Sequence, residues 1–572
     1  MNHRRSLIVL GLLVGLVIPV CDQAAAATEG EVVGGLAPAD PEEFTLTNLT
    51  VCVRDAKDQP IPGLVRDNFR VSQDGEEVPI TAFSAFAASS VASDAPDIEA
   101  PADPTGSAAV SSQQPEPVYI TIFIDNPNLL LSERNRLLNS LQSFARSIAS
   151  EDVQMMVVYF DGFADIVQPF TNDERKVIHA LRGLRMEEEG QDKRNEERAK
   201  IQRSMNRAFQ HGGQASSGLQ QELRTLYQAI EVFMSEESRV LYGSMDAVYE
   251  VMSTMSGING RKHLVYVSNG LPSIIGRDLL YELSQKNRSN TGQTMFMPYK
   301  LTRRYGALAD AANSFDIAIH TIDASGADHG PQALGTGVDR RSAAAHRITR
   351  ENRQAGLRML AEKTGGLAIV NTDEFAAACD RLKDDMLTYY LLGFTFTGSA
   401  ADKVHLIDVQ LDVEQEHQLR YRRALVEKSL PSRVQEQVTS ALVRDVPGND
   451  MGIAVSHGPW EQMTPEQWML PVAVSVPVES IALVAQGDEY VGRVVVFFAT
   501  RDIGGRRSEV VRTEHELRVP ISEYENRRRG AFDIQHRMLL GTGEHSVAAG
   551  VLDETTHRAS CDKITTASPE HS

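Results

Sequence analysis

The residues best placed to do chemistry follow two predicted strands. Residues 118–125 (VYITIFID) form an apolar run that ends in Asp125 and leads into a polar turn. Residues 263–268 form a second apolar run, and Asn269 follows it. Apolar runs of this length without alternation are typical of parallel strands buried on both faces. Because ligands bind at the carboxyl ends of such strands, Asp125 is the first candidate for a functional residue.

Other polar residues carry weaker patterns. Carboxylates on loops are usually solvated, histidines within strands are usually structural, and a D-A-S-G serine is not a nucleophile elbow. These weaker candidates are Asp161, Asp165, Thr171, Asp173, His263, His320 and Ser325. The chain contains no GxSxG, HExxH or P-loop motif. The sequence therefore predicts a protein that is not an enzyme, with no catalytic residues and no bound organic cofactor.

The elements that position Asp125 alternate between strands and helices, which predicts an α/β domain with a central parallel sheet and helices on both faces. Strands are predicted at residues 118–125, 153–160, 263–268, 316–323, 367–371 and 389–396, with an edge strand at 163–170. Helices are predicted at residues 132–149 with Ser132 as N-cap, 173–210, 219–255 with a break at 242–244, 351–363, and 373–387. A hairpin at 404–423 completes this domain.

Flanking segments divide the rest of the chain. The predicted order is a signal peptide (1–27), a small β-module (31–86), a disordered linker (87–117), the α/β domain (118–424), a linker with a short helix (425–467), a β-sandwich (468–560) and a disordered tail (561–572). The β-module carries an Asp74-Gly75 hairpin turn. A module of about 50 residues buries little core alone, so we expect it to pack on its neighbour.

The N-terminus predicts export. A basic MNHRR segment precedes 14 apolar residues and small-residue cleavage sites near residues 25–27, as in a secretory signal peptide. Lipidation at Cys21 is the less favoured alternative, because bulky residues precede that cysteine. The expected destination is periplasm, cell surface or medium, and no transmembrane helix is expected in the mature chain. The sequence leaves open whether Cys52, Cys379 and Cys561 form a disulfide.

Charge narrows the class of partner. The chain has 572 residues and a formal net charge of −20, from 57 basic and 77 acidic residues. A nucleic-acid partner requires a basic face, so this balance argues against one. Hydrophobic residues make up 42% of the chain, which is enough for a folded core.

Three stretches resemble the bacterial von Willebrand factor A-related proteins of the acidobacterial type. They are residues 53–83, the strands VYITIFID and HLVYVSNG, and residues 357–394, which contain a TGG segment. The resemblance covers residues 44–424. It implies an A-type, Rossmann-like domain and a role in protein–protein interaction or adhesion. The partner would be a protein that the sequence does not name.

The resemblance also implies a divalent-ion site, the metal-ion-dependent adhesion site. Such a site uses an Asp-x-Ser-x-Ser turn, a threonine and a second aspartate. In this chain Pro127 and Leu129 stand at the serine positions, and Ser244 or Tyr242 stands at the threonine position. The remaining oxygen ligands are Asp125, Asn126, Asn128, Ser244 and Asn269. With one carboxylate, the site is expected to be degenerate and to bind Mg²⁺ or Ca²⁺ weakly if at all.

The sequence thus predicts a secreted or envelope-associated interaction protein. One alternative is a structural or assembly factor of the cell envelope that makes permanent contacts. A hydrolase with an unrecognised site is the other alternative.

Overall fold

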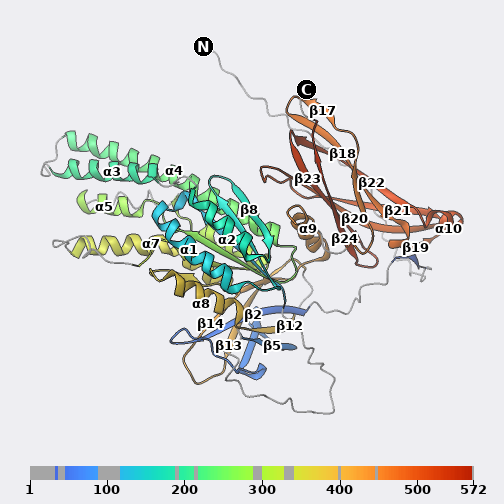
Figure 1. The fold of residues 1–572 in the computed structure, drawn as a ribbon, viewed down its shortest axis with the longest axis horizontal. Coiled ribbons are helices and arrows are strands. Elements are labelled where there is room, and N and C mark those ends of the chain that lie inside the picture. The colour runs from blue at the N-terminus through green and yellow to red at the C-terminus, as the bar shows by residue number, and fades with distance from the viewer. Residues whose placement is uncertain are drawn as a thin grey trace.

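The computed structural model describes residues 32–35, 46–87, 116–186, 192–210, 217–287, 299–327, 340–396, 401–444 and 449–569. The predicted signal peptide and almost all of the predicted linker at 87–117 lie outside these residues. The described residues form an α/β domain and two β-sandwiches (Figure 1).

The α/β domain is built on a six-stranded sheet of order β11-β10-β9-β6-β7-β8. Its strands are β6 (Val118–Asp125), β7 (Val153–Phe160), β8 (Ala164–Thr171), β9 (Arg261–Ser268), β10 (Ile317–Asp323) and β11 (Ala368–Ile369). All pairs are parallel except β7 with the edge strand β8. Numbered along the chain, the order is 3-2-1-4-5-6, so the connections change direction between β6 and β9. The predicted α/β class is confirmed.

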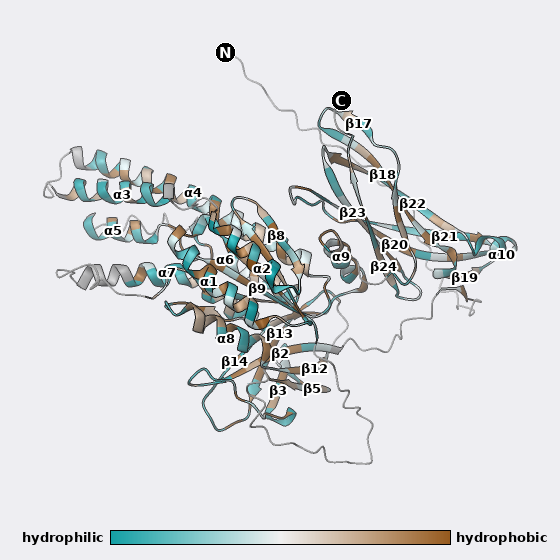
Figure 2. Ribbon diagram, viewed as in Figure 1, coloured by the Kyte–Doolittle hydropathy of each residue, from teal (hydrophilic) through white to brown (hydrophobic). Residues whose placement is uncertain are grey.

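Helices cover both faces of this sheet. Packed on one apolar cluster are α1 (Leu131–Ile148), α2 (Glu174–Gly183) and α8 (Phe375–Leu387). The other face carries α3 (Asp192–Gln210), α4 (Ser217–Met255), α5 (Arg277–Asn287), α6 (Thr302–Ser314) and α7 (Arg340–Thr364). Figure 1 shows α3, α5 and parts of α4 and α7 projecting beyond the sheet, and Figure 2 shows that α3 and α5 are largely hydrophilic.

Several helix predictions are wrong. The single helix predicted at residues 173–210 is divided into α2 and α3, which pack on opposite faces of the sheet. The helix predicted at residues 351–363 begins earlier, at Arg340, as α7. Helix α4 continues through Gly243 without a break, because Leu241 and Met245 on either side of it are buried in the core. That burial outweighs the cost of a helical glycine, about 1 kcal/mol. Helix α1 has Leu130 as its N-cap in place of Ser132, and the Glu133 side chain accepts a hydrogen bond from the Leu130 amide at 3.3 Å.

The N-terminal β-sandwich corrects a larger prediction. Its sheets are β14-β2-β12-β5 and β15-β13-β3-β4. The strands are β2 (Leu46–Asp55), β3 (Phe69–Gln73), β4 (Glu76–Val78), β5 (Ala82–Phe86), β12 (Tyr389–Thr395), β13 (Val404–Leu411), β14 (His417–Tyr421) and β15 (Ala424–Val426). Strand β12, expected in the α/β sheet, lies between β2 and β5, and β13 and β14 lie in different sheets instead of forming a hairpin. The small module thus completes its core with strands from the far end of the α/β domain.

Two further sheets form the C-terminal sandwich, β1-β19-β20-β23-β24 with β21 paired to β20, and β16-β18-β17 with β22 paired to β18. Its strands are β1 (Val32–Gly34), β16 (Ala454–His457), β17 (Glu461–Thr464), β18 (Gln467–Pro477), β19 (Ala482–Gln486), β20 (Glu489–Asp502), β21 (Val511–Pro520), β22 (Ala531–Gly541), β23 (Glu544–Asp553) and β24 (Ala559–Ala567). Strand β24 contradicts the prediction of a disordered tail from residue 561. Strand β1 also brings the start of the described chain into this sandwich.

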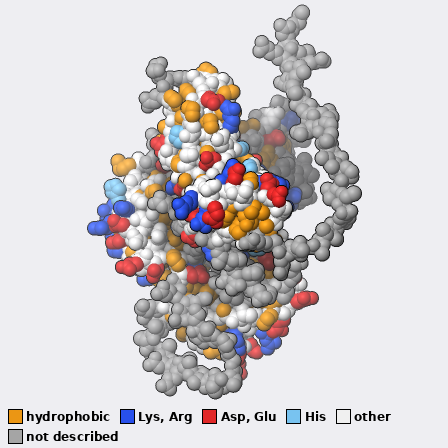
Figure 3. Space-filling view, turned by 90° about the vertical axis from the view of Figure 1, so that its right-hand side faces the viewer, with side chains coloured by type: hydrophobic (Ala, Val, Ile, Leu, Met, Phe, Trp, Pro, Cys, Tyr) orange, Lys and Arg blue, Asp and Glu red, His pale blue; other side chains and the backbone are white. Residues whose placement is uncertain are grey.

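Helix α9 (Leu430–Ala441) packs on β20, β23 and β24, where the predicted short linker helix was expected. The short helix α10 (Tyr524–Arg527) lies at the outer end of the sandwich, where Figure 3 shows acidic and basic side chains side by side. Ion pairs there include Arg527 with Glu523 at 2.7 Å. Within the described residues, no helix is long and apolar enough to cross a membrane.

Candidate functional site

The candidate site lies where β6 and β9 end, on the two strands that flank the change in connection direction. Asp125 ends β6, and Asn269 follows β9. The backbone N–H of Asn269 donates to the backbone carbonyl of Asn128 at 2.9 Å, which holds the two turns together. We call the set of Asp125, Asn126, Asn128, Ser244 and Asn269 the strand-end site. The side chains of Asp125, Asn128 and Ser244 contact one another, whereas those of Asn126 and Asn269 bond to other residues.

Asp125 is fully buried and its carboxylate accepts three hydrogen bonds. Asn128 Nδ2 donates to Oδ2 at 2.7 Å, Ser244 Oγ donates to Oδ1 at 2.9 Å, and the Tyr266 hydroxyl also donates to Oδ2. Burial raises the pKa of Asp125, and the three hydrogen bonds oppose that rise. Of the two residues considered for the threonine position, Ser244 reaches Asp125. Tyr242 instead packs against Arg304, whose Cζ lies 3.8 Å from the centroid of the Tyr242 ring.

Each asparagine side-chain oxygen in the strand-end site accepts from a guanidinium group. Arg134 Nη1 donates to Asn126 Oδ1 at 2.5 Å. Arg194 Nη2, from the first turn of α3, donates to Asn128 Oδ1 at 3.1 Å. From α7, Arg353 donates to the backbone carbonyl and to Oδ1 of Asn269.

Acidic side chains surround these arginines. Glu237 of α4 forms an ion pair with Arg194 at 3.0 Å. Glu133 of α1 accepts from Asn269 Nδ2 at 2.6 Å. Burial raises the pKa of both glutamates, and nearby arginines oppose the rise. The asparagines therefore lie among both arginine and glutamate side chains, and α3 supplies one of these arginines.

This donor set differs from what a divalent ion needs. Mg²⁺ requires near-octahedral oxygen ligands with several carboxylate or water contacts. Here the one carboxylate already accepts three hydrogen bonds, and the three amide oxygens already face cations. A metal ion would have to displace guanidinium groups and overcome their repulsion. The residues present do not fit a divalent cation.

The arginines and Tyr266 were missed at the sequence level. Tyr266 carried a weak signal, because it lies two residues before the end of a predicted strand whose neighbour ends in Asp125. Arg194 and Arg353 lie on distant helices, and no local pattern connects them to the strand ends.

The weaker candidates do not form a second site of this kind. Asp173 caps α2 by accepting from the Arg175 amide at 3.0 Å. The Ser325 hydroxyl donates to Asp323 Oδ1 at 2.6 Å and so stabilises the turn after β10. His263 and His320 are buried and contact one another at 3.0 Å.

Cysteine chemistry is equally limited. Cys52, Cys379 and Cys561 are buried and unpaired in the described part of the chain. Burial raises the pKa of each thiol to about 12. A thiol with such a pKa stays protonated near neutrality and is a poor nucleophile.

Comparison with known proteins gives no family. No protein-family model and no curated protein matches the chain. Solved structures with some similarity include the von Willebrand factor domain of the type V pili tip protein Mfa5 from Porphyromonas gingivalis, at 14% identity over 51% of this chain and 100% of that chain, with a TM-score of 0.24. BatB from Bacteroides thetaiotaomicron shows 10% identity over 47% of this chain and 97% of that chain, with a TM-score of 0.21. These TM-scores are too low to support a conclusion about fold or function.

Proposed function

We propose that this chain is an exported protein-interaction protein, acting in adhesion or a related contact, whose α/β domain works without a divalent metal. The observation that carries the proposal is the arginine network at the strand-end site. Arg194 and Arg353 supply positive charge to Asn128 and Asn269, where the family resemblance places a metal ion. The site therefore serves to fix α3 and α7 across the strand ends.

The projecting helices supply the interaction surface in this proposal. Ser244 of α4 contacts Asp125, and Glu237 lies one layer further out against Arg194. Residues earlier in α4 therefore lie beyond the strand ends, as Figure 1 shows. Val232 on this segment is 59% exposed, so its side chain lies on the surface of the projection and is accessible to a partner.

A hydrolase is less well supported. The Ser325 hydroxyl donates to Asp323 within the turn after β10 and has no hydrogen bond to a described histidine, and the buried thiols have raised pKa values. The alternative function, a permanent assembly factor of the cell envelope, would use the same surface. It differs from the proposal in that the contact with its partner would survive purification.

Site-specific photo-crosslinking in the producing cells tests the proposal. A crosslinking amino acid at Val232 should give a discrete adduct with another protein, in EDTA as well as in Mg²⁺. The same substitution at Leu539, which is 53% exposed on β22 of the C-terminal sandwich, is the matched control and should give none. An adduct that requires Mg²⁺, or equal adducts at both positions, would contradict the proposal.

A further inference from the structure

A second polar site lies between the α/β domain and the N-terminal sandwich. Strand β2 alternates there: Leu49, Val51 and Val53 enter the sandwich core, so the intervening side chains face the α/β domain. Those intervening residues include Cys52 and Arg54. They contact Asp385 in the last turn of α8, and the next residue of that turn, Met386, accepts from Arg261 at the start of β9.

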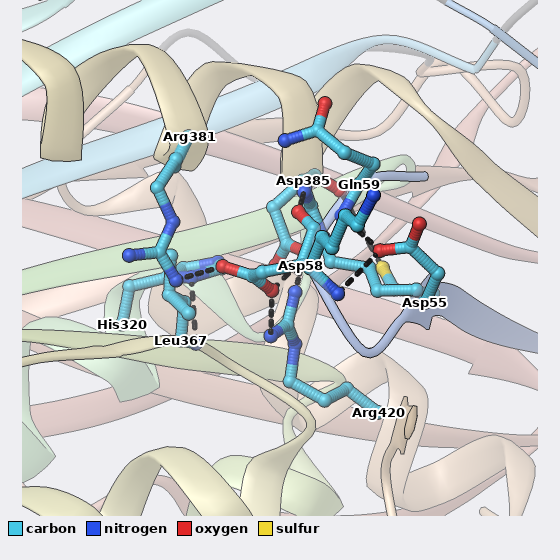
Figure 4. A network of polar contacts seen from close by, with 11 residues as sticks. Asp55, Asp58, Gln59, His320, Leu367, Arg381, Asp385 and Arg420 are labelled. Carbon is cyan, nitrogen blue, oxygen red and sulfur yellow. Dashed lines mark hydrogen bonds and ion pairs between the residues drawn. The ribbon is translucent and has the colours of Figure 1, made fainter. Parts of the chain in front are cut away.

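Ion pairs border this contact. Asp385 Oδ1 at the end of α8 accepts from Arg54 Nε at 3.2 Å and also from Arg420 of β14. Figure 4 shows Asp58 between Arg381 and Arg420, with Asp385 close by. Two carboxylates thus serve three arginines of this border, and Asp385 is already shared by two guanidinium groups.

A cavity of about 60 Å³ lies beside these pairs. A buried water needs only about 10–15 Å³, so the cavity has room for more than one water-sized occupant. Its lining includes Cys52, Arg261, His263, His320 and Asp385.

Arg261 is a buried cation without a carboxylate partner. Its Nη1 donates to the Met386 carbonyl at 2.6 Å, and its Cζ lies 3.5 Å from the centroid of the Tyr389 ring. Among the described residues, no carboxylate oxygen lies within 4.0 Å of the Arg261 guanidinium nitrogens, the limit for an ion pair. Arg261 Nη2 also has no hydrogen-bond acceptor among them. A buried charge without a counter-charge is costly. The other acids that line the cavity are engaged elsewhere: Asp316 pairs with Arg422, and Glu116 accepts from Asn48 at 3.2 Å.

His263 supplies a second unused donor. The Leu367 amide donates to His320 Nδ1 at 3.0 Å, so the proton of the neutral His320 ring is on Nε2. That Nε2 donates to His263 Nδ1 at 3.0 Å, so the proton of His263 is on its own Nε2. Burial lowers the pKa of both histidines, which keeps them neutral. His263 Nε2 is buried and has no acceptor among the described residues.

We propose that this cavity binds one small monovalent anion, of the size of chloride, between Arg261 Nη2 and His263 Nε2. The two residues are separated by one position on β9, so their side chains lie on the same face of the strand. An anion satisfies both donors and supplies the counter-charge that Arg261 lacks, which a water alone does not. The remaining space accommodates a water that donates to Asp385 Oδ2, which has no donor among the described residues. The anion thus ties the α/β domain to the sandwich.

Thermal unfolding of the mature chain tests this site. Sodium bromide or chloride is titrated into gluconate buffer at constant ionic strength. The midpoint should rise and then saturate for the wild type, and the rise should disappear in Arg261→Met and His263→Phe. Arg66→Met is the matched control, because Arg66 is an exposed arginine of the same sandwich with 59% side-chain exposure, and it should keep the rise.

Crystals grown with bromide give a readout that does not depend on variant stability. One anomalous peak between Arg261 and His263 is expected. Water alone in the cavity would overturn the proposal, as would a rise that never saturates or that persists in both variants. A peak in crystals without any saturable effect in solution would mean an adventitious ion only, which also overturns it.

Discussion

At the scale of single residues, the Asp125 carboxylate at the end of β6 is buried among hydrogen-bond donors from its own chain. Three neutral donors surround its carboxylate, and arginines one layer further out provide the positive charge. Burial still raises its pKa, so ionising Asp125 costs stability as the pH rises from about 3.9, the unfolded value, to the folded value.

Tyr266→Phe tests the balance around Asp125. The substitution removes one donor to the buried carboxylate, so the pKa of Asp125 rises further and the free energy of unfolding at pH 7 falls by about 1.5–3 kcal/mol. The loss should shrink as the pH falls through the pKa of Asp125, because a protonated carboxyl depends less on that donor. Urea unfolding across this pH range measures it.

Tyr390→Phe is the control for this measurement. The Tyr390 hydroxyl donates to the neutral Ile61 carbonyl at 2.7 Å. The decrease in the free energy of unfolding that Tyr390→Phe causes should therefore not vary over the same pH range. Equal pH dependence in both variants would contradict the role assigned to Tyr266.

Much of this site was predictable from the sequence. Asp125, Asn128 and Asn269 follow from strand ends that meet at one edge of a parallel sheet. The arginines were not predictable, because Arg194 reaches Asn128 from a helix 66 residues away along the chain. Residues on such helices are brought to the site by tertiary packing alone.

At the scale of elements, it was easier to predict which residues form strands than to predict which sheet each strand joins. The burial pattern of β13 alternates between exposed and buried, as expected for a sheet with one solvated face, whereas β6 is buried throughout. The alternation was visible at residues 404–411, but the prediction of a hairpin within the α/β domain did not use it. Strand β12 carries no such signal, because its first six residues are all buried.

Gly550→Ala tests how α9 is seated on the C-terminal sandwich. A Cβ at Gly550 would lie 2.5 Å from Val438 Cγ2 and 3.0 Å from Val434 Cγ1, both on α9. We expect a loss of about 1–3 kcal/mol in the free energy of unfolding from this overpacking. Adding Val438→Ala should make the loss smaller than the sum of the two single losses.

Gly541→Ala is the matched control on β22, where the nearest atom to a new Cβ is 4.0 Å away. Denaturant unfolding should show little change for it. A loss as large as that of Gly550→Ala would mean that glycine removal, not contact with α9, sets the effect.

At the scale of the whole molecule, the chain crosses between its domains repeatedly. Strand β1 joins the C-terminal sandwich, β2 to β5 then enter the N-terminal sandwich, and β12 to β15 return to it after the α/β domain. The polar border around Asp385 therefore connects two domains that the chain already links twice. We expect these domains to unfold together.

Asp385→Asn tests that coupling. It leaves Arg54 and Arg420 without their shared carboxylate, which should cost about 3–5 kcal/mol for a broken buried pair. Scanning calorimetry should show the shared transition separating into two. Asp384→Asn, a less buried neighbour, is the control and should keep a single transition. A single transition in Asp385→Asn at the wild-type midpoint would contradict the coupling.

The measurement that tests the central claim most directly is thermal unfolding of the mature chain in millimolar Mg²⁺, Mn²⁺ or Ca²⁺ against EDTA, with Asp125→Ala in parallel. A metal that binds the native state at 100 times its dissociation constant would stabilise it by about 2.7 kcal/mol, a visible shift of the midpoint. If arginines hold the strand-end site, the midpoint of the wild type stays the same with every ion. A shift that Asp125→Ala abolishes would show that the site binds a metal after all.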